Sequence, residues 1–156
     1  HTEIAKLLID RGAIVNSVSN IGWLVIFCAA ENGNIEIVKL LLDKYAETAC
    51  LLTAVNAVSD KRTVLHVAAA CGHTEICELL IASGALVNVI RVGGGTPLHC
   101  ATESGNIDTV KLLLDEYVKT TSKSQIINTV NDNGWSALDI AEREEYTDII
   151  ELFAEE

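Results

Sequence analysis

The chain repeats itself, and this constrains its fold more than any other feature. Residues 1–16 match residues 73–88 at 11 of 16 positions, at an offset of 72. Residues 32–45 match residues 104–117 at 10 of 14 positions, again at an offset of 72. Two matches with one offset predict that the chain is built from duplicated structural units.

The 72-residue unit divides again into two shorter repeats. The sequence TVLHVAAACGHTEICELL at Thr63–Leu80 recurs as TPLHCATESGNIDTVKLL at Thr96–Leu113, at an offset of 33. The larger period therefore combines one repeat of 33 residues with one of about 40. A unit this short cannot bury its own apolar face, so neighbouring units must stack to form a core.

The residues that recur are typical of one family. They are TPLH at Thr96–His99, the Ala68–Ala69 pair, the Gly72–His73 pair, and GA-x-VN at Gly84–Asn88. This ordered set resembles the ankyrin repeat, and the resemblance covers essentially the whole chain. It implies an all-α fold, an ankyrin-repeat solenoid of about 4.5 stacked helix-turn-helix units. A short extended segment, here called a finger, is expected to link successive units.

We expect one domain of five units. They are a partial repeat at residues 1–19, a long repeat at 20–57, a repeat at 58–90, a long repeat at 91–130 and a C-terminal capping repeat at 131–156. The partial repeat lacks a finger and a first helix. Its apolar edge should therefore be exposed, unless upstream repeats or a partner cover it.

The local residue types agree with a pair of helices in each repeat. Thr96 is suited to cap a first helix, and Pro97 fits its first turn, where a missing N–H costs little. Gly33, Gly72 and Gly105 should end the first helices. The second helices carry aliphatic residues at i, i+3 and i+4, the spacing of one buried helical face.

The two long repeats carry seven extra residues each, after Tyr45 and Tyr117, where the other repeats have a glycine. Seven residues make about two turns of helix. Ala46–Leu52 is therefore expected to lengthen its helix, whereas Val118–Ser124, rich in Thr and Ser, is typical of a loop. The alternative is that both are tolerated insertions at a surface edge.

One finger is shorter than the others. The step from Asn56 to Thr63 is seven residues, whereas the equivalent step elsewhere is eight. Lys61 also takes the usual glycine position. We expect the tip of this finger to be irregular.

The charge balance narrows the choice of partner. The chain has 22 acidic and 11 basic residues and a net charge of −11 at pH 7. Such a surface repels phosphate backbones, so no nucleic-acid binding is expected. It either favours another protein or peptide with a basic face or only keeps the chain soluble. No apolar run approaches about 18 residues, so no membrane insertion is expected.

The five cysteines are odd in number and show no C-x-x-C spacing. This pattern favours free thiols in a reducing compartment, so we expect a cytoplasmic or nuclear protein. Cys28 and Cys100 occupy the same repeat position, which favours core packing. Cys71 lies at a position that, by the resemblance, faces the binding groove, and it is a candidate reactive thiol.

Residue types that often carry catalysis occupy scaffold positions in this chain. His66 and His99 share one repeat position, where the resemblance implies hydrogen bonding between neighbouring repeats. Gly93–Gly95 lacks the G-x-x-x-x-G-K frame of a phosphate loop and is interpreted as a finger tip. The carboxylates show no fixed pairing, and no cluster has metal-ligand spacing. We therefore expect no enzymatic activity, no metal and no cofactor.

The resemblance implies binding through a concave groove of finger tips and first helices. Trp23 and Trp135 follow turn glycines at finger positions that face outward, roughly 30 Å apart at about 10 Å per repeat. Each is either an anchor for a partner or folded onto the first helix of its own repeat. The other groove positions are Asn20, Ile21, Glu31, Asn32, Asp60, Arg62, Cys71, Val92, Glu103, Ser104, Asp132, Asn133, Arg143 and Glu144. Five of them are acidic and two are basic, which predicts a preference for a basic partner.

These features together predict a protein–protein interaction module, part of a larger adaptor, scaffold or effector. One alternative is a structural spacer whose groove is unused. Another is a regulatory domain attached to an enzyme or channel. Asn16 and Asn88 also resemble acceptors of asparaginyl hydroxylation, although the same asparagine normally ties down the finger.

Overall fold

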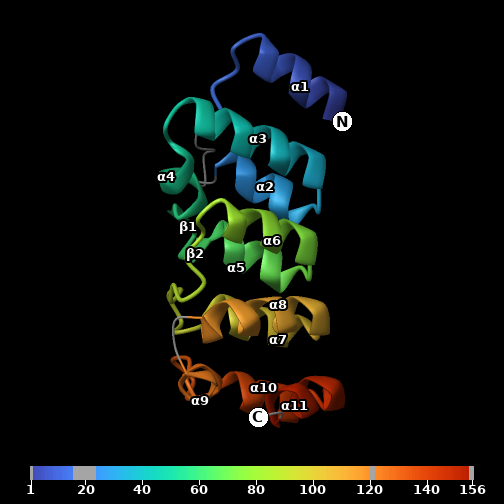
Figure 1. Ribbon diagram of the computed structural model, residues 1–156, viewed down its shortest axis with the longest axis vertical. Coiled ribbons are helices and arrows are strands. Elements are labelled where there is room, and N and C mark those ends of the chain that lie inside the picture. The colour runs from blue at the N-terminus through green and yellow to red at the C-terminus, as the bar shows by residue number, and fades with distance from the viewer. Residues whose placement is uncertain (1, 16–23, 120–121, 155–156) are drawn as a thin grey trace.

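The computed structural model describes residues 2–15, 24–119 and 122–154. These residues form eleven helices and one two-stranded antiparallel sheet. In chain order the elements are α1 (Thr2–Asp10), α2 (Val25–Glu31), α3 (Ile35–Glu47), α4 (Leu51–Val55), β1 (Val58–Ser59), β2 (Arg62–Thr63), α5 (Val64–Ala70), α6 (Thr74–Ala82), α7 (Pro97–Ser104), α8 (Ile107–Val118), α9 (Lys123–Ile127), α10 (Ala137–Arg143) and α11 (Thr147–Ala154). Figure 1 shows helix pairs stacked along the long axis, from α1 at one end to α10 and α11 at the other.

The helices form two rows. The first helices of the repeats, α2, α5, α7 and α10, contact one another in that order, and the second helices, α1, α3, α6, α8 and α11, form the other row. Between the rows lies an aliphatic core in which Leu65, Leu98, Leu80 and Leu113 are fully buried. This arrangement confirms the predicted all-α solenoid.

Each central repeat begins with a threonine and a histidine that cap the start of the first helix. Thr63 and Thr96 are the N-cap residues, and their backbone N–H groups donate to Nδ1 of His66 and His99 at 3.2 Å. Because Nδ1 accepts, Nε2 carries the ring hydrogen. Nε2 of His66 donates to the Gly95 carbonyl at 3.2 Å, and Nε2 of His99 donates to the Thr129 carbonyl at 3.0 Å. Both carbonyls belong to the next finger. The expected hydrogen bonds between neighbouring repeats are confirmed.

The turns after the first helices α2, α5 and α7 each hold a glycine in a conformation that suits other residues poorly, whereas Glu145 takes this place after α10. Gly33, Gly72 and Gly105 have φ values of +68°, +69° and +69°, a left-handed conformation that costs other residues energy. The following repeat also packs directly on them. A Cβ at Gly33 would lie 2.8 Å from the His73 ring, and one at Gly105 would lie 2.7 Å from the Tyr146 ring. These glycines set how closely the turns stack.

The insertions of the long repeats match the two expectations only in part. α3 stops at Glu47, because Ala49 takes a left-handed conformation with φ +56° and Cys50 N–H donates to the Tyr45 carbonyl at 3.0 Å. This is a Schellman C-cap, here without glycine. With 13 residues against nine in α6, α3 is lengthened by Ala46 and Glu47 but not by the whole insertion, and a separate helix, α4, follows. In the second insertion, the part predicted to be a loop contributes Lys123 and Ser124 to α9.

The short finger is regular, so the expected irregular tip is wrong. Ser59 pairs with Arg62 across a two-residue turn, and the turn residues Asp60 and Lys61 have φ values of +46° and +67°. Positive φ at both positions defines a type I′ hairpin turn, whose twist matches that of the strands. The missing residue shortens the finger to this tight turn.

The edge of the stack at α1 is apolar and open, as expected. Ile4 and Leu8 are 60% and 55% exposed, whereas the equivalent Ile76 and Leu80 are buried at 2% and 0%. α5 packs on α6, but within the described ranges no first helix packs on α1. No described helix is long and apolar enough to cross a membrane.

The same edge explains one wrong prediction about the cysteines. Cys100 is buried, as expected for a core position, but Cys28 is exposed. Cys28 lies on α2, which contacts another first helix only on its α5 side in the described part of the chain. An equivalent repeat position is therefore not an equivalent environment at the end of the stack.

Candidate functional site

The predicted groove residues that the structure describes gather at finger tips and at the ends of first helices. Asn20, Ile21 and Trp23 lie outside the described residues. The others, with two cations that the sequence analysis missed, define what we call the finger face: Glu31, Asn32, Asp60, Lys61, Arg62, Cys71, Arg91, Val92, Glu103, Ser104, Asp132, Asn133, Trp135, Arg143 and Glu144. All are exposed except the half-buried Arg62, Arg91 and Trp135.

Neighbouring fingers are joined by backbone hydrogen bonds. Val92 N–H donates to the Lys61 carbonyl at 3.2 Å, and Asp132 N–H donates to the Gly93 carbonyl at 3.1 Å. Close packing accompanies the second bond, since a Cβ at Gly94 would lie 2.4 Å from the Asp132 nitrogen. These hydrogen bonds join three successive fingers into one continuous surface, which we call the ledge.

The last finger is closed on itself. Asn131 N–H donates to the Trp135 carbonyl at 2.9 Å, and the Asn131 side chain accepts from Asn133 N–H and Trp135 N–H at 3.0 and 3.1 Å. Asn131 is buried at 9% exposure. These bonds fix where Asn133 and Trp135 stand on the finger face.

Trp135 is partly covered by its own repeat. The Arg143 guanidinium, at the end of α10, lies 4.7 Å from the centre of the Trp135 ring, in a cation–π contact. Of the two alternatives for this tryptophan, the structure shows the one folded onto its own first helix. The indole is still half-buried rather than fully enclosed, so the Trp135–Arg143 pair is available as a joint contact.

Carboxylates pair with the arginines of the finger face. Arg91 contacts both Glu103 oxygens at 3.2 and 3.3 Å, Arg143 contacts Glu144 at 2.6 Å, and Arg62 lies 3.8 Å from Asp60. The Arg91–Glu103 pair spans 12 positions of sequence and is created by folding. Exposed pairs of this kind contribute little to stability, roughly 0–1 kcal/mol each.

The finger face is close to neutral as a result. With Lys61 and Arg91 included, five carboxylates face four cations, so this surface carries about one of the net −11 charges. The remaining acidic surplus lies elsewhere, for example at Glu36, Glu75 and Asp115 on the second helices. The charge count that predicted a basic partner omitted the two cations that the fold brings in.

Three of the cysteines have thiol pKa values raised above the ordinary value. Burial raises the pKa of Cys77 to about 12 and that of Cys100 to about 11. Partial burial, with the nearby Glu31 carboxylate, also raises the pKa of the exposed Cys71, so the geometry does not support its role as a reactive thiol. Within the described residues, no three His, Cys, Asp or Glu side chains are placed to hold a metal.

The curated relatives that the chain matches are much longer proteins, and the match covers only a small part of each of them. The chain is 39% identical over 82 residues to protein phosphatase 1 regulatory subunit 12A of Mus musculus, covering 53% of this chain and 7% of that protein. It is 38% identical over 95 residues to human ankyrin repeat and KH domain-containing protein 1, covering 61% and 4%. It is 34% identical over 142 residues to alpha-latrotoxin-Lg1a of Latrodectus geometricus, covering 88% and 9%.

A family model supports the same assignment along the whole length. The model described as ankyrin repeats (3 copies) matches residues 1–51, 47–125 and 92–156. Together with the stacked helix pairs and the fingers between them, these matches identify the fold and its repeat. The chain belongs to the ankyrin repeat family.

Proposed function

We propose that this chain binds a partner protein through the finger face. Ankyrin repeats are protein-interaction modules. The observation that carries the proposal is the backbone bonding of successive fingers, from Lys61 to Val92 and from Gly93 to Asp132. A ledge fixed before binding loses little conformational freedom when a partner docks.

Two parts of the finger face suit direct contact. Val92, at a central finger tip, is an aliphatic side chain that is 65% exposed. The Trp135–Arg143 pair combines two of the three residue types most enriched among interface hot spots. We propose that these three residues form the centre of the contact and that the ion pairs around them form its rim.

The ion pairs of the finger face favour a partner surface that carries both positive and negative charges. Each arginine of the face already has a carboxylate beside it, so a uniformly basic surface would gain little there. The net charge of −11 acts at longer range and would speed encounter with a basic partner. The preference for a basic partner should therefore appear in the association rate, and that rate should fall as the salt concentration rises.

Other functions make different demands on the same surface. A structural spacer needs the stack but not the finger face. A non-catalytic regulatory domain would use the finger face to contact an enzyme or channel and is compatible with the proposal; one relative is named as a regulatory subunit. The five free thiols support action in the cytosol or nucleus, which we also propose.

Site-specific photo-cross-linking tests the proposal. A photoreactive residue replaces Val92 or Asn133 on the finger face, with Glu78 on α6 and Lys111 on α8, both exposed, as control positions. We expect cross-linked partner bands from the finger-face positions only. Bands only from the second helices would contradict the finger face, and no bands from any position would favour the spacer.

A further inference from the structure

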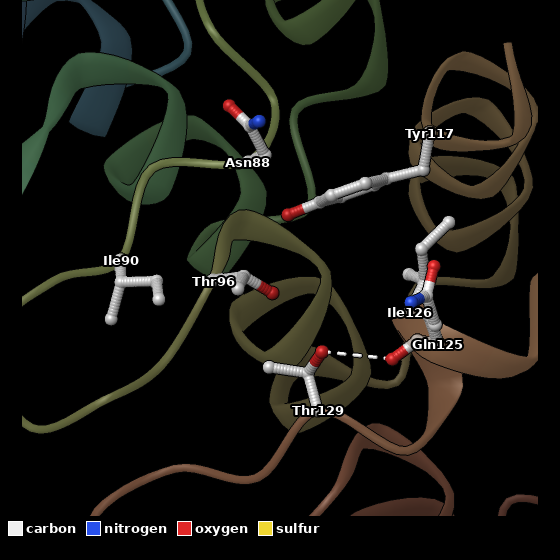
Figure 2. Close-up of a pocket in the computed structure, with 7 residues that line it drawn as sticks. All are labelled: Asn88, Ile90, Thr96, Tyr117, Gln125, Ile126 and Thr129. Carbon is white, nitrogen blue, oxygen red and sulfur yellow. Dashed lines mark hydrogen bonds between the residues drawn. The ribbon is translucent and has the colours of Figure 1, made fainter. Parts of the chain in front are cut away.

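A small recess lies between the finger that enters the fourth repeat and the extra helix α9. Figure 2 shows its walls: Tyr117 from α8 reaches across toward Asn88 on the opposite side, and Gln125 and Ile126 come from α9. The recess has a volume of about 140 Å³, which is the scale of one amino-acid side chain or a few water molecules. It includes no residue of the finger face.

The recess exists because an insertion has removed a pair of hydrogen bonds that links neighbouring repeats elsewhere in the stack. At the equivalent position one repeat earlier, the Asn56 side chain donates to the Gly84 carbonyl at 2.9 Å and accepts from Leu86 N–H at 2.9 Å. In the next repeat α8 continues as a helix to Val118 through this region. Asn88 is accordingly exposed, and its side chain forms no hydrogen bond with the residues that the structure describes.

The free polar groups around the recess are neutral. Asn88 offers both a donor and an acceptor, and Figure 2 shows its carboxamide turned outward at the rim. Gln125 has its Oε1 occupied by the Ser122 hydroxyl at 3.2 Å, which leaves its NH2 group as a donor. Thr129 donates its hydroxyl to the Gln125 backbone carbonyl at 2.9 Å and can still accept. No charged side chain is among the residues that line the recess.

The other long repeat does not carry this polar set. At an offset of 72, Tyr45 takes the place of Tyr117, but Leu24, Thr53 and Ala57 stand where the recess has Thr96, Gln125 and Thr129. The tyrosine, the extra helix and the asparagine, Asn16 at the place of Asn88, therefore belong to both long repeats, whereas the Gln125 carboxamide and the hydroxyls at the places of Thr96 and Thr129 belong only to the second. A general consequence of the insertion would have appeared in both.

We propose that this recess binds an uncharged carboxamide side chain, Gln or Asn, from an extended segment of a partner polypeptide. The aliphatic part of the side chain packs between Ile90, Ile126 and the Tyr117 ring. Its carboxamide accepts from Gln125 and donates to Thr129. The main chain of the segment passes over the rim and pairs with the Asn88 carboxamide, which supplies one donor and one acceptor as a peptide group does. A Glu or Lys side chain would bury a charge without a counter-charge and is excluded.

Peptide titration followed by NMR tests the proposal on the whole chain. The probes are three capped tripeptides, identical except for Gln, Glu or Lys at the centre. The Gln peptide should shift the side-chain NH2 signals of Asn88 and Gln125 and the backbone amide of Thr129, and the other two should not. Asn88→Asp and Gln125→Glu should each weaken binding of the Gln peptide by about fivefold or more, since each removes a donor to the ligand and adds an unpaired charge.

Asn34→Asp is the matched control, because it makes the same chemical change at an exposed residue before α3 that belongs neither to the recess nor to the finger face and should leave binding of the Gln peptide unchanged. Thermal unfolding of each variant verifies that the fold is kept, as expected for two exposed side chains. The proposal is overturned if all three peptides shift the same signals equally, if the Gln peptide shifts none of them, or if Asn88→Asp and Gln125→Glu bind it as the unchanged chain does. None of these results bears on the finger face.

Discussion

Acidification should destabilise this fold through His66. The ring is fully buried, with Nδ1 accepting from Thr63 N–H and Nε2 donating to the Gly95 carbonyl, both at 3.2 Å. Burial lowers the His66 pKa from its ordinary 6.5 to about 4. The folded state therefore favours the neutral ring, and a second proton would face the Thr63 N–H donor.

The sign and size of the effect follow from this pKa. Stability is fully present above pH 6.5 and is lost as the pH falls from 6.5 through about 4, because the unfolded chain binds the proton first. The free energy of unfolding should fall by about 2 kcal/mol between neutral pH and pH 5 from this ring alone. The full loss, near the folded pKa and below it, is about 3 kcal/mol.

Urea unfolding at several pH values, with His66→Gln as the comparison, measures this contribution. The variant will be less stable at neutral pH, but it lacks the titrating ring, so its unfolding free energy should fall less on acidification. Carboxylates and His99 titrate in both proteins and cancel in the difference. Equal pH dependence in the two proteins between pH 7.5 and pH 5 would refute the reasoning.

Three further perturbations have defined outcomes. Gly105→Ala should lower the free energy of unfolding by about 2 kcal/mol or more, because it combines left-handed strain with a clash. Gly134, with φ +77° and open space around it, is the control, and Gly134→Ala should lower the free energy of unfolding by about 1 kcal/mol. Equal losses in chemical denaturation would contradict the stacking of the turns. Tyr45→Phe removes a buried hydroxyl that donates to the preceding repeat at 2.9 Å and should cost about 1 kcal/mol, with no loss as the opposing result. In the folded protein a maleimide should label exposed Cys71 and spare buried Cys100, as read by mass spectrometry of peptides; early labelling of Cys100 would show that the core opens.

Much of the fold follows from the sequence because short-range rules dictate it. Thr96, Pro97 and Gly105 mark the start and end of a first helix through capping, a fixed φ and a left-handed turn. The repeated histidine position predicted the bonds between repeats in the same way, since His66 and His99 both accept from an N-cap threonine and donate to a carbonyl of the next finger.

The wrong predictions arose where the outcome depended on one unusual residue conformation. Ala49 in a left-handed C-cap ends α3, and Asp60 and Lys61 both adopt positive φ in the short finger. Ala49 and Lys61 are residue types for which that conformation is uncommon, so composition alone favoured a helix through the insertion and an irregular tip. The tertiary contacts of the long repeat and the tight strand pairing decided otherwise.

The finger-tip positions of the candidate residues could be predicted from the sequence, but the charge of the surface that they form could not. Val92, Asp132 and Asn133 are on the finger face because finger tips recur with the repeat. Arg91 was missed because its role depends on Glu103, which lies far along the chain and is brought near only by folding. The sequence signal that was available is the single basic residue before Val92.

Hydrogen exchange of the chain with and without its cross-linked partner tests the central claim most directly. The claim is that three bonded fingers form one ledge that a protein occupies. Binding should slow exchange at residues 58–63, 90–96 and 130–135 together and leave α8 unchanged. Slower exchange confined to the second helices, or to one finger without its neighbours, would contradict it.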